Sequence, residues 1–288
     1  MQRKLHSLEG IVAAFALVFV LALTIGFAQA GEPKPLKATS LRSSSVMVQD
    51  VGTGEVVIDK NADVVVPIAS ITKLMTAMVV LDRALELDQR VVLSREDVDA
   101  RKGSASRLRT GAVLTRDELL LLSLMASENR AAAALARTYP GGMDAFVAVM
   151  NEKAEALGMT DSRFVDATGL SARNVSSARD LVKLVNAAHY YPLIREYSTR
   201  GRATVKVYGR PMAFGNTNGL VRSTQWNIGL SKTGYISEAG RCLVMRVNVA
   251  SKDLIVVLLD SWGKHSRVGD ANRIKKWLET TAATGRPG

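Results

Sequence analysis

The order of strand-like and helix-like segments constrains the fold of this chain more than any other feature of its sequence. Residues 45–67 alternate around Gly52-Thr53-Gly54 and predict a β-hairpin. Helical spacing replaces this alternation from about residue 70 to residue 198, and the strand period then returns. Such a chain pairs its two ends in one antiparallel sheet, with the helical region inserted between them. We therefore expect an α/β (α+β) fold of two lobes, with a cleft where the lobes meet.

Local signals define the individual elements. Thr115–Glu118 has the form of a capping box that opens a helix, and Ser177 is placed to cap another. The lone cysteine, Cys242, lies in a strand-like run and is expected to be a small buried apolar residue. The later strands are expected at 203–209, 227–236, 240–250 and 253–262, and a closing helix at 266–281.

The N-terminal residues have the pattern of a signal peptide. Arg3 and Lys4 precede an uncharged apolar run, Ile11–Phe27, and Ala28-Gln29-Ala30 offers a small-x-small cleavage site. As a helix this run would span about 26 Å, which is short for a bilayer core of about 30 Å. Cleavage is therefore favoured over a retained anchor. The sequence predicts a signal peptide at 1–30, a linker at 31–45, one domain at 46–281 with a helical lobe at about 84–200, and a polar tail at 282–288.

Charge and cysteine content exclude several classes of protein. The formal net charge of the 288 residues is +11, so an exported form could stay near anionic polymers or lipid head groups. No nucleic-acid-binding motif occurs, and no nucleic-acid partner is expected. With one cysteine there is no intramolecular disulfide and no thiolate metal cluster. We expect an exported protein with no stable membrane anchor after cleavage.

Ser70 and Lys73 form the first candidate motif, at the start of the apolar segment PIASITKLMTAMVVLD. Positions i and i+3 share one face of a helix, so the lysine amine can reach the serine hydroxyl. Burial disfavours the ammonium form and lowers the pKa of a lysine, which makes the amine a usable base. Ser261 and Lys264 have the same spacing, but they lie at a strand end and a glycine turn, and we interpret that pair as chance.

Two further short motifs follow in the chain. Ser127 and Asn129 lie at a break between helical stretches, where a hydroxyl could relay a proton and an amide could hold a peptide group. By itself this pattern is more often a helix cap. Lys232-Thr233-Gly234 lies on an expected strand. There the lysine and threonine would supply a cation and a hydroxyl to a carboxylate, and the glycine would leave room for another backbone.

Taken in order, the three motifs match the signature of penicillin-binding proteins and serine β-lactamases. The surrounding segments, including LMASENRAAAALA, FVDATGLSARNVS and LSKTGYISEAGRCLVM, resemble D-alanyl-D-alanine endopeptidases of the penicillin-binding protein 7 type, which are serine peptidases of family S11. The resemblance covers nearly all of residues 40–280. It implies a β-lactamase/transpeptidase-like fold, with an antiparallel five-stranded sheet flanked by helices and an inserted all-helical lobe.

The resemblance also implies roles for the motif residues. Ser70 would be the acylated nucleophile, Lys73 its base and Ser127 a proton-transfer group. The remaining positions would bind substrate. Asn129 would hold an amide of the substrate, Lys232 and Thr233 would hold its carboxylate, and Gly234 would leave the strand open. The backbone N–H groups of Tyr235 and Ser70 would form the oxyanion hole.

The resemblance predicts a serine D,D-peptidase that hydrolyses D-Ala–diaminopimelate cross-links of peptidoglycan through a Ser70 acyl-enzyme. Its partners would be peptidoglycan stem peptides, with β-lactams as covalent inhibitors. The resemblance implies no metal and no organic cofactor, and it places the protein in the periplasm. A D,D-carboxypeptidase that removes terminal D-Ala, or a non-catalytic penicillin-sensing or murein-binding module, are the alternatives. A class A β-lactamase is disfavoured because its Glu-x-x-Leu-Asn segment is absent and Asp166 does not match that pattern.

Overall fold

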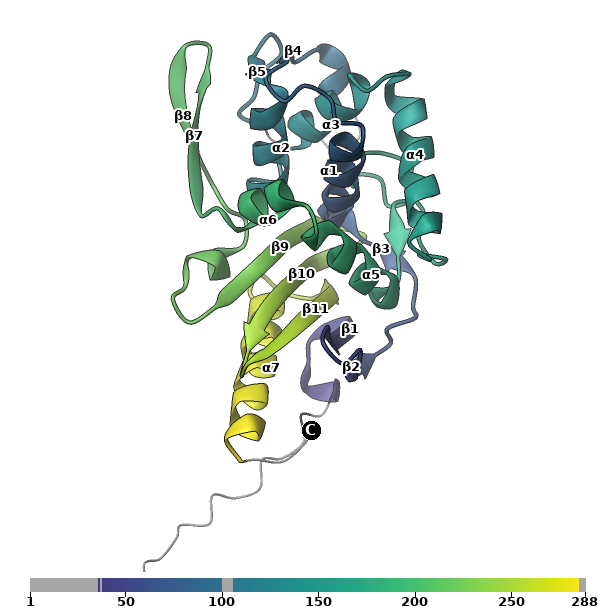
Figure 1. Cartoon of the computed structure of the whole chain (residues 1–288), viewed down its shortest axis with the longest axis vertical. Helices are drawn as coiled ribbons and strands as arrows, with labels where there is room; N and C mark the ends of the chain where they lie inside the picture. The colour runs from purple at the N-terminus through teal and green to yellow at the C-terminus, as the bar shows by residue number, and fades with distance from the viewer. Residues whose placement is uncertain (1–35, 37, 100–105, 285–288) are drawn as a thin grey trace, which may run out of the picture. The chain divides into compact units, whose positions relative to one another are not determined.

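One five-stranded antiparallel sheet forms the base of the structure, a computed structural model that describes residues 36, 38–99 and 106–284. The strand order is β2-β1-β11-β10-β9 (Figure 1). The two N-terminal strands, β1 (Ser43–Asp50) and β2 (Val56–Lys60), form the expected hairpin, and β1 also pairs with β11 (Lys252–Ser261) from the far end of the chain. The outer strands are β10 (Gly240–Val249) and β9 (Asn227–Ile236). The predicted sheet, built from both ends of the chain, is confirmed.

Both faces of the sheet are covered, which explains why the central strands β1, β10 and β11 each carry an uninterrupted apolar run. Alternate side chains of β10, including Leu243 and Met245, pack with Ile274 of α7 (Ser266–Ala283). The intervening residues Cys242 and Val244 face the other way and join the core beneath the inserted helices. Cys242 is fully buried, as expected, and burial raises the pKa of its thiol to about 11, so the thiol stays protonated and unreactive.

The region between β2 and β9 is mainly helical, and several of its helices lie against one face of the sheet (Figure 1). It also carries three two-stranded sheets, of which the sequence indicated only the strand β7. The helices are α1 (Lys73–Asp82), α2 (Arg116–Met125), α3 (Asn129–Arg137), α4 (Gly142–Ala156), α5 (Ala178–His189) and α6 (Pro192–Thr199). The small sheets pair β3 (Val66–Pro67) with β6 (Val175–Ser176), β4 (Arg90–Val92) with β5 (Val113–Thr115), and β7 (Arg202–Val207) with β8 (Arg210–Gly215).

Helix starts follow the predicted capping residues. The Thr115 side chain accepts a hydrogen bond from the backbone N–H of Glu118, whose carboxylate accepts one from the backbone N–H of Thr115. This is the predicted capping box, and it satisfies two N–H groups that the helix leaves unpaired. Ser177 caps α5 by accepting from the backbone N–H of Asp180.

The start of the domain lies earlier than predicted. Ser43 begins β1 and is buried, and its backbone N–H and hydroxyl both donate to the buried carboxylate of Asp270 on α7. A linker that ends at residue 45 is therefore wrong, because residues 43–45 already belong to the sheet. The expected signal peptide at 1–30 and residues 285–288 of the tail lie outside the described residues. Within the described part, no helix has the length and apolar character needed to cross a membrane.

Candidate active site

The first part of the site is the turn that carries Ser70. A short 3-10 helix, Ala69–Thr72, leads directly into α1, so that Lys73 occupies the first position of the longer helix. The backbone of Ala69 is left-handed, with φ of 47°, a conformation that non-glycine residues rarely adopt. Such strain is found where a functional side chain must be aimed. The turn holds Ser70 at the surface end of a helix whose next residues are buried.

Lys73 is fully buried and its amine contacts three oxygen atoms. Its Nζ donates to Ser70 Oγ at 2.7 Å, to Asn129 Oδ1 at 2.7 Å and to the backbone oxygen of Thr168 at 2.6 Å. A neutral amine keeps two hydrogens and one lone pair, and only the serine among these partners can also donate. When Lys73 loses its proton, the lone pair must therefore accept from Ser70. This is the arrangement that a serine–lysine nucleophile requires.

The electrostatics favour the neutral lysine. Burial lowers the pKa of Lys73 to about 7, because the ammonium loses its hydration, while the negative charges of Asp166 and Glu128 partly oppose the shift. A base with a pKa near 7 is half deprotonated at neutral pH and can still deliver its proton later. The sequence argument for a lysine of lowered pKa is thus supported by the packing around it.

A loop that the sequence analysis did not assign to the site closes over Lys73. Asp166 organises it by accepting hydrogen bonds from Thr168 N, Thr168 Oγ1 and Gly169 N at 2.7 Å each, and from Ser171 N at 3.0 Å. Gly169 has φ of 79°, and a Cβ at this position would lie 1.9 Å from the backbone oxygen of Ala69. Only glycine lets the loop approach the turn at Ala69 and Ser70 this closely. The Asp-x-x-Gly pattern in FVDATGL is the sequence signal for such a turn.

The carboxylate of Asp166 accepts all four of these hydrogen bonds. Three of them go to Oδ1 and one to Oδ2, so the carboxylate is directed toward its own loop. This agrees with the expectation that Asp166 does not take the part of the deacylating glutamate of class A β-lactamases.

The second part of the site joins the other two motifs. Lys232, on β9, is fully buried, and its Nζ donates to Ser127 Oγ and to the backbone oxygen of Thr233, each at 2.9 Å. The hydroxyl of Thr233 lies 2.6 Å from that of Thr217. Ser127 itself lies between α2 and α3 with φ of 58°, a second left-handed residue at the site. A cation and hydroxyl groups thus gather at the edge strand, as a carboxylate would require.

Three cations influence one another around β9. Burial lowers the pKa of Lys232 well below its ordinary value, and the positive charges of Lys73 and Arg267 lower it further. Arg267, on α7, donates to the backbone oxygens of Gly234 at 2.9 Å and Cys242 at 3.1 Å. It therefore ties β9 to β10 behind the site, a role the motifs did not reveal. An anion that enters the site would relieve this repulsion.

Gly234 and Tyr235 follow on the same strand. A Cβ at Gly234 would lie 2.8 Å from the backbone oxygen of Ile68 and 3.1 Å from the backbone nitrogen of Ser70. The backbone that packs against this open strand surface is therefore the chain's own turn at Ile68–Ser70. Tyr235 is 56% exposed, with the Arg241 guanidinium 4.6 Å from its ring centre.

The structure gathers the predicted residues in two hydrogen-bonded groups. Ser70, Lys73 and Asn129 form one, and Ser127, Lys232 and Thr233 form the other. Asn129 differs from the expectation in one respect, because its Oδ1 accepts from Lys73 instead of standing free for a substrate amide. The second Ser-x-x-Lys match does not form such a pair: Ser261 Oγ lies 2.5 Å from Ser43 Oγ. Among the described residues no cluster of potential metal ligands was found.

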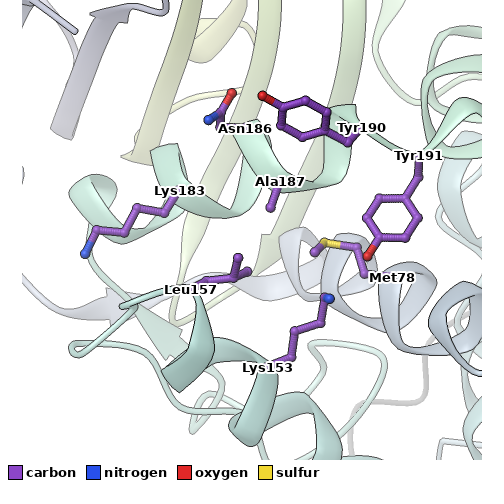
Figure 2. Close-up of a pocket in the computed structure, with 8 residues that line it drawn as sticks. All are labelled: Met78, Lys153, Leu157, Lys183, Asn186, Ala187, Tyr190 and Tyr191. Carbon is purple, nitrogen blue, oxygen red and sulfur yellow. The ribbon is translucent and has the colours of Figure 1, made fainter.

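A separate hollow of about 720 Å³ lies between α1, α4 and α5, and Figure 2 shows the side chains around it. None of the motif residues lines this hollow, and the Lys153 ammonium beside it is already paired with Asp82 at 2.6 Å. The volume of a hollow therefore does not identify the candidate active site. The buried lysines and the hydroxyl groups that could take part in catalysis lie in the two groups of motif residues. The residues that line the hollow are Met78, Lys153, Leu157, Lys183, Asn186, Ala187, Tyr190 and Tyr191.

Comparison with known proteins gives consistent matches. Residues 31–263 match the family Peptidase_S11, described as D-alanyl-D-alanine carboxypeptidase. A D-alanyl-D-alanine endopeptidase of Pseudomonas aeruginosa is 47% identical over 274 residues, covering 93% of this chain and 88% of that protein. A protein of the same name from Escherichia coli is 45% identical over 277 residues, with the same coverage of 93% and 88%.

Solved structures agree with these matches. The DD-transpeptidase of Streptomyces K15 superposes with a TM-score of 0.77 at 30% identity, covering 83% of this chain and 98% of that one. Penicillin-binding protein D2 from Listeria monocytogenes, solved in its cefotaxime-bound form, superposes with a TM-score of 0.73 at 28% identity, covering 82% and 97%.

Proposed function

The chain belongs to the S11 family of serine peptidases, and from that premise we propose that it is a D,D-peptidase that cleaves peptidoglycan stem peptides through an acyl-enzyme at Ser70. The observation that carries the proposal is the buried Lys73 amine at 2.7 Å from Ser70 Oγ, with a pKa lowered to about 7. A buried lysine with this pKa serves as a base at neutral pH.

Acylation follows from the contacts of the two groups. Ser70 gives its proton to Lys73 and forms a bond to the carbonyl carbon of D-alanine, while the backbone N–H groups of Ser70 and Tyr235 hold the developing oxyanion. The C–N bond then breaks. The Ser127 hydroxyl, which accepts from Lys232 Nζ at 2.9 Å, gives its proton to the leaving amine, and the proton that Lys73 took from Ser70 replaces it. Lys232 and Thr233 bind the carboxylate of the leaving side.

Deacylation completes the hydrolysis. A water molecule adds to the ester carbon, one of its protons returns to Ser70 Oγ, and the shortened stem peptide leaves as a carboxylate. Lys73, whose Nζ lies 2.7 Å from Ser70 Oγ, accepts a proton from the water and delivers it to that oxygen. With Asp166 engaged in its own loop, this step is slow for a bulky adduct. We therefore expect β-lactams to acylate Ser70 and to remain bound for a long time.

Cleavage of cross-links is the activity that the comparisons favour within the family. Relatives at 47%, 45% and 36% identity are named endopeptidases, whereas five matching proteins named carboxypeptidases are 28% to 32% identical. The proposed substrate is a D-Ala–diaminopimelate cross-link. Because such a substrate lies in the cell wall, we also propose that residues 1–30 direct export to the periplasm.

The test is digestion of a purified cross-linked murein dimer beside a pentapeptide that ends in D-Ala–D-Ala. We expect the protein to convert dimer to monomer, and Ser70→Ala and Lys73→Ala to abolish this conversion. Lys264→Ala is the matched control, because it removes the exposed lysine of the second Ser-x-x-Lys match and should leave cleavage unchanged.

The other outcomes are equally informative. Release of free D-alanine without dimer cleavage would make the protein a carboxypeptidase. Covalent binding of a labelled penicillin without any product would indicate a sensing module, and full activity in Ser70→Ala would overturn the proposed nucleophile.

A further inference from the structure

A second hollow, of about 300 Å³, opens beside Ser127. Ala126 and Glu128, the two chain neighbours of that serine, form one wall, and Phe214 and Gly215 at the end of β8 form another. Two residues after Gly215, Thr217 contacts Thr233 of the carboxylate-binding group. The hollow therefore lies next to the residues that are proposed to hold the leaving amine and its carboxylate.

The walls of the hollow are held in place by specific contacts. Ser106 donates to the Glu128 carboxylate at 2.7 Å, and the Arg107 guanidinium lies 4.1 Å from the centre of the Phe214 ring. Farther out, the Tyr208 hydroxyl between β7 and β8 donates to the backbone oxygen of Thr110 at 2.7 Å. The hairpin is thus fastened to the segment that carries Arg107, and it stands next to β4 and β5 in Figure 1.

The chemistry of the lining suits one kind of occupant. Ala126 and Phe214 offer apolar surface near Ser127, whereas Arg107 is exposed at the rim and offers a planar cation that can bind a carboxylate or a peptide oxygen. A leaving group that fits must begin with an amine, continue through a methylene chain and end in peptide or acidic groups. Free D-alanine has no such extension, since its side chain is a single methyl group.

We propose that this hollow is a subsite for the second stem peptide of a cross-link, the half that leaves with the amine. The inference rests on the proposed D,D-peptidase function and names the element that selects cross-links over terminal D-alanine. The side chain of the diamino acid runs between Ala126 and Phe214, and Arg107 binds the acidic or peptide oxygens beyond it. A carboxypeptidase substrate leaves the subsite empty.

Gly215 offers a way to block the hollow without disturbing the site. A Cβ at this position meets no atom within 4 Å, and the backbone lies outside the left-handed region, so a larger side chain is accommodated. We expect Gly215→Leu to lower the ratio of dimer cleavage to D-alanine release by at least about tenfold, which corresponds to about 1.4 kcal/mol. Arg107→Ala should lower the same ratio about fivefold to tenfold, in the range of a typical hydrogen bond.

The measurements are kcat/KM for the murein dimer, kcat/KM for D-alanine release from a pentapeptide, and the acylation rate with a labelled penicillin. Arg109→Ala is the matched control, because this exposed arginine lies on the same segment but does not line the hollow. It should leave all three values unchanged. The melting temperature of each variant shows whether folding is intact.

The results separate the subsite from the underlying function. If wild-type protein is not acylated and yields no product, the proposed function fails before the subsite is tested by any variant. If wild-type protein cleaves dimer and the ratio stays constant in both Gly215→Leu and Arg107→Ala, the subsite proposal is overturned. An equal loss of dimer cleavage and D-alanine release would also overturn it, because the hollow would then serve the half that both substrates share.

Discussion

Acylation of Ser70 should depend on pH through Lys73. With a pKa of about 7, the amine is neutral in about 1% of molecules at pH 5 and in about half of them at pH 7. Only the neutral amine can accept the serine proton, so the second-order rate constant for acylation should rise about fiftyfold between pH 5 and pH 7. A lysine with the ordinary value of 10.5 would instead give a tenfold rise for every pH unit up to about pH 10.

The assay is the rate at which a fluorescent penicillin labels the protein between pH 5 and pH 10. Lys73→Arg is the control, because a guanidinium keeps its proton throughout this range. Acylation of this variant should be about a thousandfold slower than that of wild-type protein at pH 8, and it should not rise between pH 5 and pH 7. Any decline on the alkaline side should disappear in Lys232→Arg, since the charge of that residue would then be permanent. A flat profile between pH 5 and pH 7, or a first midpoint above pH 9, would refute the assignment of Lys73 as the base.

Two further changes test the packing around the same lysine. Gly169→Ala would place a Cβ 1.9 Å from the backbone oxygen of Ala69, so penicillin labelling should fall at least about tenfold. The control is Gly158→Ala, also at positive φ but with open space around it, which should cost about 1 kcal/mol of stability and leave labelling intact. Equal labelling in the two variants would contradict the close approach of the loop to Ala69. The free energy of unfolding should rise between pH 7 and pH 10 by about 3 kcal/mol more in wild-type protein than in Lys73→Met, because the lysine pKa is about 7 when folded and about 10.5 when unfolded. Parallel pH dependence of the two proteins in denaturant titrations would show that this lysine is not buried as described.

The elements that the sequence predicts best are those whose structure is determined by residues close to one another in the chain. The strand at 227–236 has the bounds of β9, and the capping box at Thr115 and the cap at Ser177 are present as expected. Each of these depends on residues within a few positions of one another. The second strand of the β7–β8 hairpin was missed because Pro211 and the short, mostly exposed strand around it give no clear alternation.

The parts of the site that sequence did not reveal depend on contacts across long stretches of chain. Thr168 contributes only its backbone oxygen to Lys73, from 95 residues away, and no side-chain pattern announces a backbone acceptor. The engagement of Asn129 with Lys73 depends on the packing of α3 against α1. The buried state of Lys73 could be suspected from its apolar surroundings, but the lowered pKa required the loop that covers it.

The position of β1 in the sheet has a consequence for how the protein acquires its activity. This strand lies between β2 and β11, and Ser43 at its start bonds Asp270, 227 residues later in the chain. Pairings between such distant segments form late and slowly, since the intervening chain must first be brought together. The carboxylate-binding strand β9 joins the sheet through the same late strands. Ser70 and Lys73 are therefore made long before β11 and α7 are available to complete the sheet, so under the proposed function we expect acylation to begin only after these late elements have paired.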